Sequence, residues 1–248
     1  MGLFDRFRGK SDKKTDRPKA SPADKWAERA RDRRAQNLDR QEALHALAEM
    51  KTPEAAAALL KRFTFKIDPS ITDQEEKEVA FQGIVAAGTD AIEPVRQFAA
   101  KADSLAWPMR ILKELLSEEA YIDELVDWLS RWDTDYAKFI DPKLQLLVAL
   151  EDHKNAKIRE AVEPFLSDVN ETARFHAVAT SLAQEDSACL TPLLSTLKDE
   201  ESFRVKKKIC DGLSLRRWSV PDAEREAVQK ALPLEYALTA DGRITSRG

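Results

Sequence analysis

Apolar residues recur along most of the chain at the spacing of three to four residues that marks one face of an α-helix. Leu38, Leu44 and Leu47 belong to one such run, with polar or charged residues between them. Glycine is scarce and runs of β-branched residues are nearly absent, which favours an all-α fold. The periodicity predicts helices over 22–36, 38–50, 53–65, 72–88, 90–102, 104–116, 118–132, 141–152, 155–167, 170–184, 186–198, 201–214 and 222–231.

Residues that favour helix starts support these boundaries. Such residues accept hydrogen bonds from the free N–H groups of the first turn. We expect starts at Ser21-Pro22, Thr52-Pro53, Thr72 (with Glu75 as a capping box), Ser104, Asp141, Asn155, Asn170 and Ser202, and a left-handed stop at Gly88. Paired in order, the helices form five antiparallel hairpins that start near residues 53, 90, 119, 155 and 186. The helix over 38–50 then precedes them as a partial repeat or cap.

The end of the chain has a different pattern. The segments 235–239 and 243–245 flank Ala240-Asp241-Gly242, which is typical of a turn. This arrangement predicts a small C-terminal β-hairpin, and we expect it to cover the open end of the stacked helices.

Three segments repeat one local motif: Ile92-Glu93-Pro94-Val95, Val162-Glu163-Pro164-Phe165 and Leu190-Thr191-Pro192-Leu193. In the second and third, an aspartate follows, and an arginine comes five or six residues later. Recurrence at this spacing indicates a repeat architecture. The motif resembles the HEAT repeat, best over the last two repeats and mainly by helix periodicity elsewhere between residues 38 and 218.

The resemblance implies an α-solenoid of about five HEAT-like antiparallel helix pairs that works by binding proteins. It implies no reaction, because one fold hosts many functions. We expect Arg174 and Arg204 to pair with neighbouring aspartates along the stack. The predicted organisation is a basic N-terminal arm (1–21), a charged helix (22–37), the solenoid (38–218) and a C-terminal cap segment with the hairpin (219–248).

Aromatic residues provide the first candidate for a binding surface. Several of them lie near aspartates in the segment 121–139. Aromatic side chains bury a large area at low entropic cost, so they are favoured at binding sites. An aromatic anchor with an acidic rim would suit a basic or amphipathic peptide, whereas the alternative is core packing. The predicted partner-binding residues are Trp107, Tyr121, Trp128, Trp132 and Tyr136.

Charge is unevenly distributed along the chain. Residues 1–40 carry a net charge of +6 and the remaining residues −10. The opening residues resemble the amphipathic N-termini of bacterial peripheral membrane proteins such as the signal-recognition-particle receptor, and the alternative is a disordered tail. The candidates for contact with an anionic surface are Leu3, Phe4, Arg6, Phe7 and Arg8 in the arm, and Lys206, Lys207, Lys208, Arg216 and Arg217 near the end of the stack. For the residues near the end of the stack, the alternative is that they are ordinary solvated charges that bind no surface.

Patterns typical of catalysis are missing from the sequence. The three histidines are isolated, the two cysteines lack further ligands at metal spacing, and no phosphate-binding loop occurs. His176 is expected to be a partly buried packing residue. Cys210 follows three lysines, which could lower its pKa and make the thiol reactive. The alternative is that Cys210 lies on the buried face of its helix. We therefore predict no catalytic residue, no cofactor and no metal.

These features together predict a cytoplasmic, bacterial-type scaffold or adaptor that binds a protein partner. Residues 1–10 would add a contact at the inner face of the membrane. A transmembrane helix is not expected, because no stretch is long and apolar enough to cross a bilayer. The alternative is a nucleic-acid binder or a HEAT-like DNA glycosylase, but the acidic body (pI near 5.6) disfavours a nucleic-acid partner.

Overall fold

The computed structural model describes residues 21–247 of the chain. In this range it contains thirteen α-helices and two short β-strands, which confirms the all-α fold with a small C-terminal hairpin. The elements are α1 (Pro22–Arg31), α2 (Asn37–Met50), α3 (Pro53–Leu60), α4 (Ser70–Ala86), α5 (Ile92–Ala99), α6 (Ala106–Leu115), α7 (Glu118–Leu129), α8 (Asp141–Glu151), α9 (Ala156–Val162), α10 (Glu171–Ala183), α11 (Leu190–Asp199), α12 (Phe203–Arg216), α13 (Arg225–Ala231), β1 (Tyr236–Leu238) and β2 (Ile244–Ser246).

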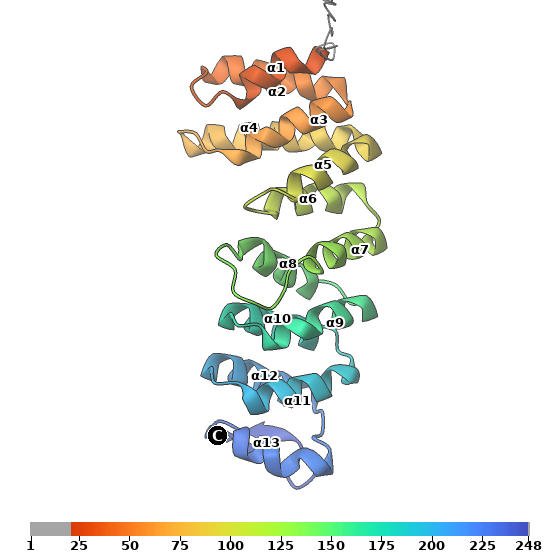
Figure 1. The fold of residues 1–248 in the computed structure, drawn as a ribbon, viewed down its shortest axis with the longest axis vertical. Helices are drawn as coiled ribbons and strands as arrows, with labels where there is room; N and C mark the ends of the chain where they lie inside the picture. The colour runs from red at the N-terminus through yellow and green to blue at the C-terminus, as the bar shows by residue number, and fades with distance from the viewer. Residues whose placement is uncertain (1–20, 248) are drawn as a thin grey trace, which may run out of the picture.

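The helices follow one another in consecutive pairs along the long axis of the molecule (Figure 1). Most odd-numbered helices pack on a neighbouring odd one, such as α1 on α3 and α3 on α5. Most even-numbered helices pack on a neighbouring even one, such as α8 on α10 and α10 on α12. The turns inside the pairs, each leading from an odd helix to the next even one, lie along the left-hand side in Figure 1. We call these turns, together with the first residues of the even helices, the turn edge.

Most of the predicted helix starts are confirmed. Thr52 Oγ1 accepts a 3.2 Å bond from the N–H of Ala55, and Asn170 Oδ1 accepts bonds from the first turn of α10. The Thr72 start is wrong, because α4 begins directly after Pro69. The predicted stop at Gly88 is confirmed by its φ of 63°, just after α4 ends.

The helix at the N-terminal end corrects one prediction. α1 packs on both α2 and α3 and buries Ala23 and Ala30. The segment 38–50 is therefore no partial repeat, because α1 completes its pair. The highly charged composition of α1 concealed this role, since only two alanines and one half-buried tryptophan, Trp26, face its neighbours.

A single hydrophobic core runs through the described residues, from Ala23 in α1 to Ile244 in β2. Close packing between helices of neighbouring pairs depends on small residues. A Cβ on Gly83 would lie 2.5 Å from the Cβ of Ala48, so α2 and α4 approach closely only because position 83 lacks a side chain. Gly212 plays the same role against Leu182, between α12 and α10.

A buried network of charges joins the first two pairs. Glu76 Oε2 accepts a 2.8 Å bond from Arg40 Nε and a 2.7 Å bond from Arg62 Nε. Arg62 also pairs with Asp73 at 2.7 Å, and Lys77 with Asp73 at 2.6 Å. All five side chains are buried. Burial on its own would raise the pKa of Asp73, but the bonds from Lys77 and Arg62 hold it below its usual value.

The C-terminal hairpin covers the last helix pair. β1 and β2 pair antiparallel, with Tyr236 opposite Ser246. β2 packs on α12 and α13 packs on α11, while Tyr236 and Ile244 are buried. A two-stranded hairpin is marginal by itself, so this packing supplies its stability.

Candidate functional site

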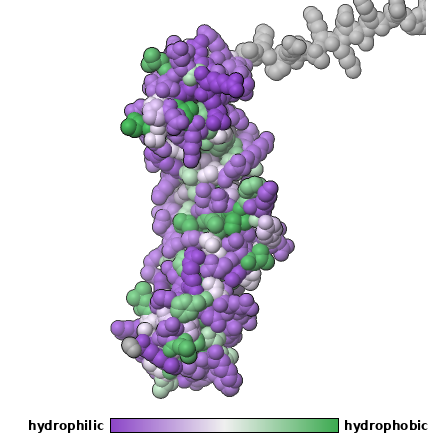
Figure 2. Space-filling model, turned by 90° about the vertical axis from the view of Figure 1, so that its left-hand side faces the viewer, coloured by the Kyte–Doolittle hydropathy of each residue, from purple (hydrophilic) through white to green (hydrophobic). Residues whose placement is uncertain are grey.

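Exposed hydrophobic side chains gather on the turn edge. Nine large hydrophobic residues in the described part of the chain are exposed. Six of them lie in the turns inside the pairs or at the first two positions of even helices: Leu38, Ile71, Tyr136, Phe139, Val169 and Phe203. Figure 2 looks onto this edge and shows hydrophobic patches along its length, with the broadest near the middle.

Trp107 occupies the corresponding position in the third pair. It is the second residue of α6, as Leu38 is of α2 and Ile71 is of α4. Its ring is half-buried and stacks on Phe63 with the centroids 4.5 Å apart. These two rings form part of the lining of a groove of about 1070 Å³ between α3, α5 and the start of α6. The predicted residue Trp107 therefore does reach the surface.

The turn between α7 and α8 is the longest on the edge and is held in place by polar contacts. Lys143 Nζ is buried and donates to the carbonyl of Asp133 at 3.1 Å and to Asp168 Oδ2 at 2.6 Å. The N–H of Val169 donates to the carbonyl of Thr134 at 3.0 Å. The next helix pair thus fixes this turn from below.

Two aromatic side chains project from this anchored turn. Tyr136 is 83% exposed and Phe139 is 71% exposed. Trp132, at the start of the turn, is half-buried and lines a hollow of about 380 Å³ together with Phe139 and Leu105. The structure therefore places Trp132 and Tyr136, two of the predicted partner-binding residues, on the same turn.

Tyr121 and Trp128 are corrections to the predicted surface. They are 5% and 4% exposed, so they belong to the core and cannot serve as contact residues on the accessible surface. Tyr121 packs edge-on against His153, and burial raises its pKa to about 12. Both rings lie on one face of α7, seven residues apart, and that face packs against neighbouring helices.

Acidic side chains surround the exposed hydrophobic residues in the second half of the edge. Five of them are exposed and form no ion pair within residues 21–247: Asp133, Asp135, Asp141, Asp199 and Glu201. The only exposed base without an ion pair in the same turns is Lys138. The first turn of the edge lacks this acidic excess, since its exposed Arg33 and Arg34 offset the exposed Asp32 and Asp39.

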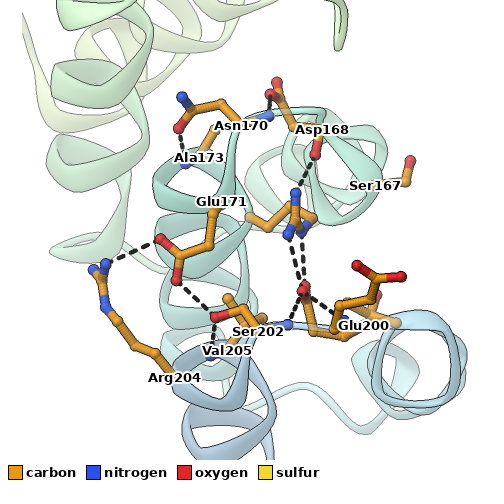
Figure 3. Close-up of polar contacts among 12 residues, drawn as sticks. Ser167, Asp168, Asn170, Glu171, Ala173, Glu200, Ser202, Arg204 and Val205 are labelled. Carbon is orange, nitrogen blue, oxygen red and sulfur yellow. Dashed lines mark hydrogen bonds and ion pairs between the residues drawn. The ribbon is translucent and has the colours of Figure 1, made fainter.

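Charged contacts bind the fifth pair to the sixth beside this edge (Figure 3). Arg174 Nε and Nη2 donate to the two oxygens of Glu200 at 2.7 and 2.9 Å, and Nη1 donates to the carbonyl of Asp168 at 2.8 Å. Arg204 pairs with Glu171 at 3.1 Å. The expected aspartate partners were therefore wrong, because the acceptors are glutamates of the neighbouring pair.

Burial alone would raise the pKa of Glu200, but the bonds from Arg174 and the backbone of Ser202 lower it overall. Asp168 has a different partner, Lys143, so its side chain is not available to Arg174. These contacts explain the repeat motif as a structural device that joins neighbouring pairs.

The predicted basic residues of α12 do not form one surface. Lys206 donates to the carbonyl of Ala231 at 3.2 Å, and Lys207 pairs with Asp211 at 2.9 Å. Lys208 lies over the ring of Phe175. Arg216 and Arg217 lie at the opposite end of the helix, where Arg216 donates to a backbone carbonyl and Arg217 ends the helix in a left-handed conformation. The predicted anionic-surface contact by these five residues is not supported by a common face.

The two cysteine thiols in the described part of the chain are buried. Burial raises the pKa of Cys189 to about 11 and that of Cys210 to about 12, so Cys210 takes the buried alternative. His176 is half-buried, as predicted, and burial lowers its pKa. Among residues 21–247, no three His, Cys, Asp or Glu side chains lie together as a metal site would need.

Two further observations concern membranes. Within residues 21–247, no helix has both the length and the apolar character that crossing a bilayer requires. The predicted membrane-contacting residues Leu3, Phe4, Arg6, Phe7 and Arg8 lie outside the described residues.

Sequence reasoning missed Leu38, Ile71, Val169 and Phe203 as surface residues. Each looks like an ordinary member of an apolar stripe. The available signal was their place beside a helix start, at Asn37, Ser70, Asn170 and Ser202, where side chains lie at the rim of the fold. No family model, curated protein or solved structure matches this chain.

Proposed function

We propose that this protein is a non-enzymatic scaffold that binds a protein partner along its turn edge. We further propose that its stacked helix pairs form an α-solenoid of the HEAT type. One observation carries the proposal: six of the nine exposed large hydrophobic residues between 21 and 247 lie on this single edge.

Isolated hydrophobic residues are normal on protein surfaces, but their concentration on one edge is typical of an interaction site. The exposed residues recur at corresponding positions, since Leu38 and Ile71 are the second residues of α2 and α4, and Phe139 and Val169 each lie two residues before α8 and α10. A partner that lies across several turns would remove them from water together. Each large side chain buried in this way contributes on the order of 1.5–3 kcal/mol before the costs of association.

The fixed geometry of the edge favours recognition. The α7–α8 turn is tied to its neighbours by Lys143 and by the N–H of Val169, so Tyr136 and Phe139 project from an anchored segment. An anchored loop loses less conformational entropy on binding than a free one. The two thiols are buried and the arginines of the repeat motif are engaged in ion pairs, so both fit structural roles.

The test is affinity capture from cells that naturally produce the protein, followed by quantitative mass spectrometry. The edge variant combines Phe139→Ser, Val169→Ser and Phe203→Ser. The matched control combines Val148→Ser and Leu215→Ser, which are exposed but lie away from the edge. We expect a protein that co-purifies with the wild type and the control but not with the edge variant. Equal capture by all three would contradict the proposed function.

A further inference from the structure

We propose that the second half of the turn edge binds a basic amphipathic helix of about 15 residues, lying parallel to the long axis of the stack. This inference rests on the proposed function and names the class of partner. The helix would place apolar residues at positions i, i+7 and i+14 on Phe139, Val169 and Phe203.

The spacing of the exposed residues is the first argument. Phe139 and Val169 lie two residues before α8 and α10, Phe203 is the first residue of α12, and α10 packs directly on both α8 and α12. Packed helices are about 8–10 Å apart, so the apolar points recur at about that interval over roughly 16–20 Å. Seven residues of an α-helix rise about 10.5 Å, and 14 residues rise about 21 Å.

A β-strand fits this spacing less well, and a polyproline helix fits the spacing but not the width of the patch. In a β-strand, residues i and i+2 face the same side and are about 6.7 Å apart, whereas residue i+3, at about 10 Å, faces the opposite side. A polyproline helix repeats at about 9.3 Å, but it presents its side chains in single file. The broad patch at the α7–α8 turn, where Tyr136 lies beside Phe139, fits an α-helix better, because positions i, i+3 and i+4 share one face.

The charge of the exposed side chains is the second argument, and it predicts that the partner is positively charged. The exposed, unpaired Asp133, Asp135 and Asp141 lie at one end of this segment, and Asp199 and Glu201 lie at the other. Only Lys138 opposes them among the exposed unpaired bases of these turns. Lysine or arginine beside the apolar stripe of the partner would complement these carboxylates, which gives selectivity and faster association.

The first turn sets a limit to the site. Its exposed Arg33 and Arg34 offset the exposed Asp32 and Asp39, so the excess of unpaired carboxylates belongs to the turns from α7–α8 onward. Three pairs thus contribute, with their apolar points in register with two heptads of the partner.

Three fluorescein-labelled synthetic peptides of about 15 residues, the length set by the helix rise, test the inference with the full-length protein. The first carries leucine at seven-residue spacing among alanine and lysine. The second has the same composition with its leucines clustered. The third is proline-rich with leucine at every third position. Fluorescence anisotropy at low salt gives the affinities, and thermal unfolding confirms that each protein variant is folded.

We expect the heptad peptide to bind about tenfold more tightly than the clustered one, and to weaken as salt is added. Binding should fall by about tenfold or more in the Phe139→Ser, Val169→Ser, Phe203→Ser variant, and stay unchanged in the Val148→Ser, Leu215→Ser control. Equal affinity for the heptad and clustered peptides, tighter binding of the proline-rich peptide, or no effect of the edge variant would overturn the inference.

The two proposals fail in different ways. If the edge variant loses a cellular partner but the heptad peptide shows no preference, the edge binds a partner of another shape. If the edge variant captures the same proteins as the wild type, the scaffold function itself is wrong.

Discussion

The buried charges between the first two pairs lead to a sharp prediction about stability. Glu76 is the shared acceptor of Arg40 and Arg62, and all three side chains are buried. In Glu76→Ala, Arg62 keeps its bond to Asp73, but Arg40 retains only neutral acceptors, among them the carbonyl of Ala35 at 2.9 Å. A buried guanidinium would then lack a counter-charge.

Breaking a buried ion pair by removing one partner costs about 3–5 kcal/mol. Since Glu76 serves two arginines, we expect Glu76→Ala to fall in that range. The matched control is Glu28→Ala, which breaks the exposed pair between Arg31 and Glu28 and should cost less than about 1 kcal/mol. The double variant Arg40→Met, Glu76→Leu should recover much of the loss, because it removes the charge together with its partner.

The assay is urea unfolding followed by far-UV circular dichroism, combined with hydrogen exchange read by mass spectrometry. Helix pairs that contact mainly their neighbours can unfold in parts, so we expect the exchange of α1–α4 to accelerate while α9–α12 stay protected. A Glu76→Ala protein within about 1 kcal/mol of the wild type would show that the buried arginines do not need this counter-charge. Uniform loss of protection along the chain would contradict the local role of the network.

Three further predictions concern packing, thiols and acid. Gly83→Ala should cost about 1–3 kcal/mol in thermal unfolding, because the added Cβ overlaps α2. Cys189 and Cys210 should resist a thiol reagent such as DTNB at pH 8 until denaturant is added. At that pH only about one in a thousand Cys189 thiols and one in ten thousand Cys210 thiols would be ionised. Fast labelling of the native protein would show that they are not buried. Because the folded pKa of Glu200 is lowered, its stabilisation is present above the unfolded value of 4.5 and is lost as the pH falls. Arg174→Gln should therefore flatten the decline of stability below about pH 4.5, and an unchanged slope would contradict this.

Much of the fold is predictable because it depends on local signals. The 3.6-residue period placed the helices, and residues such as Thr52 and Asn170 placed their starts, since capping involves only neighbours in the sequence. The hairpin near Gly242, whose φ is 83°, followed from turn chemistry alone. The start of α4 was missed because Thr72 with Glu75 matches the capping pattern better than Pro69, which precedes the true first residue, Ser70.

The site was less predictable, because it depends on which side of each helix faces its neighbours. Tyr121 and Trp128 are seven residues apart and so share one helical face, but this spacing does not reveal whether the face is buried or exposed. Residues such as Val169 and Phe203 are 34 positions apart, and only the stacking of α10 on α12 brings them to one edge. The partner of Arg174 was likewise set by a glutamate in the next pair, at a spacing the local motif does not contain.

Photo-crosslinking in cells that naturally produce the protein shows whether the turn edge contacts a partner. A benzophenone amino acid is placed in turn at Phe139, Val169 and Phe203 on the turn edge, and at Leu215 at the end of α12. The account predicts one discrete protein adduct from the three edge positions and none from Leu215. Adducts that form only from Leu215, or equally from all four positions, would contradict it.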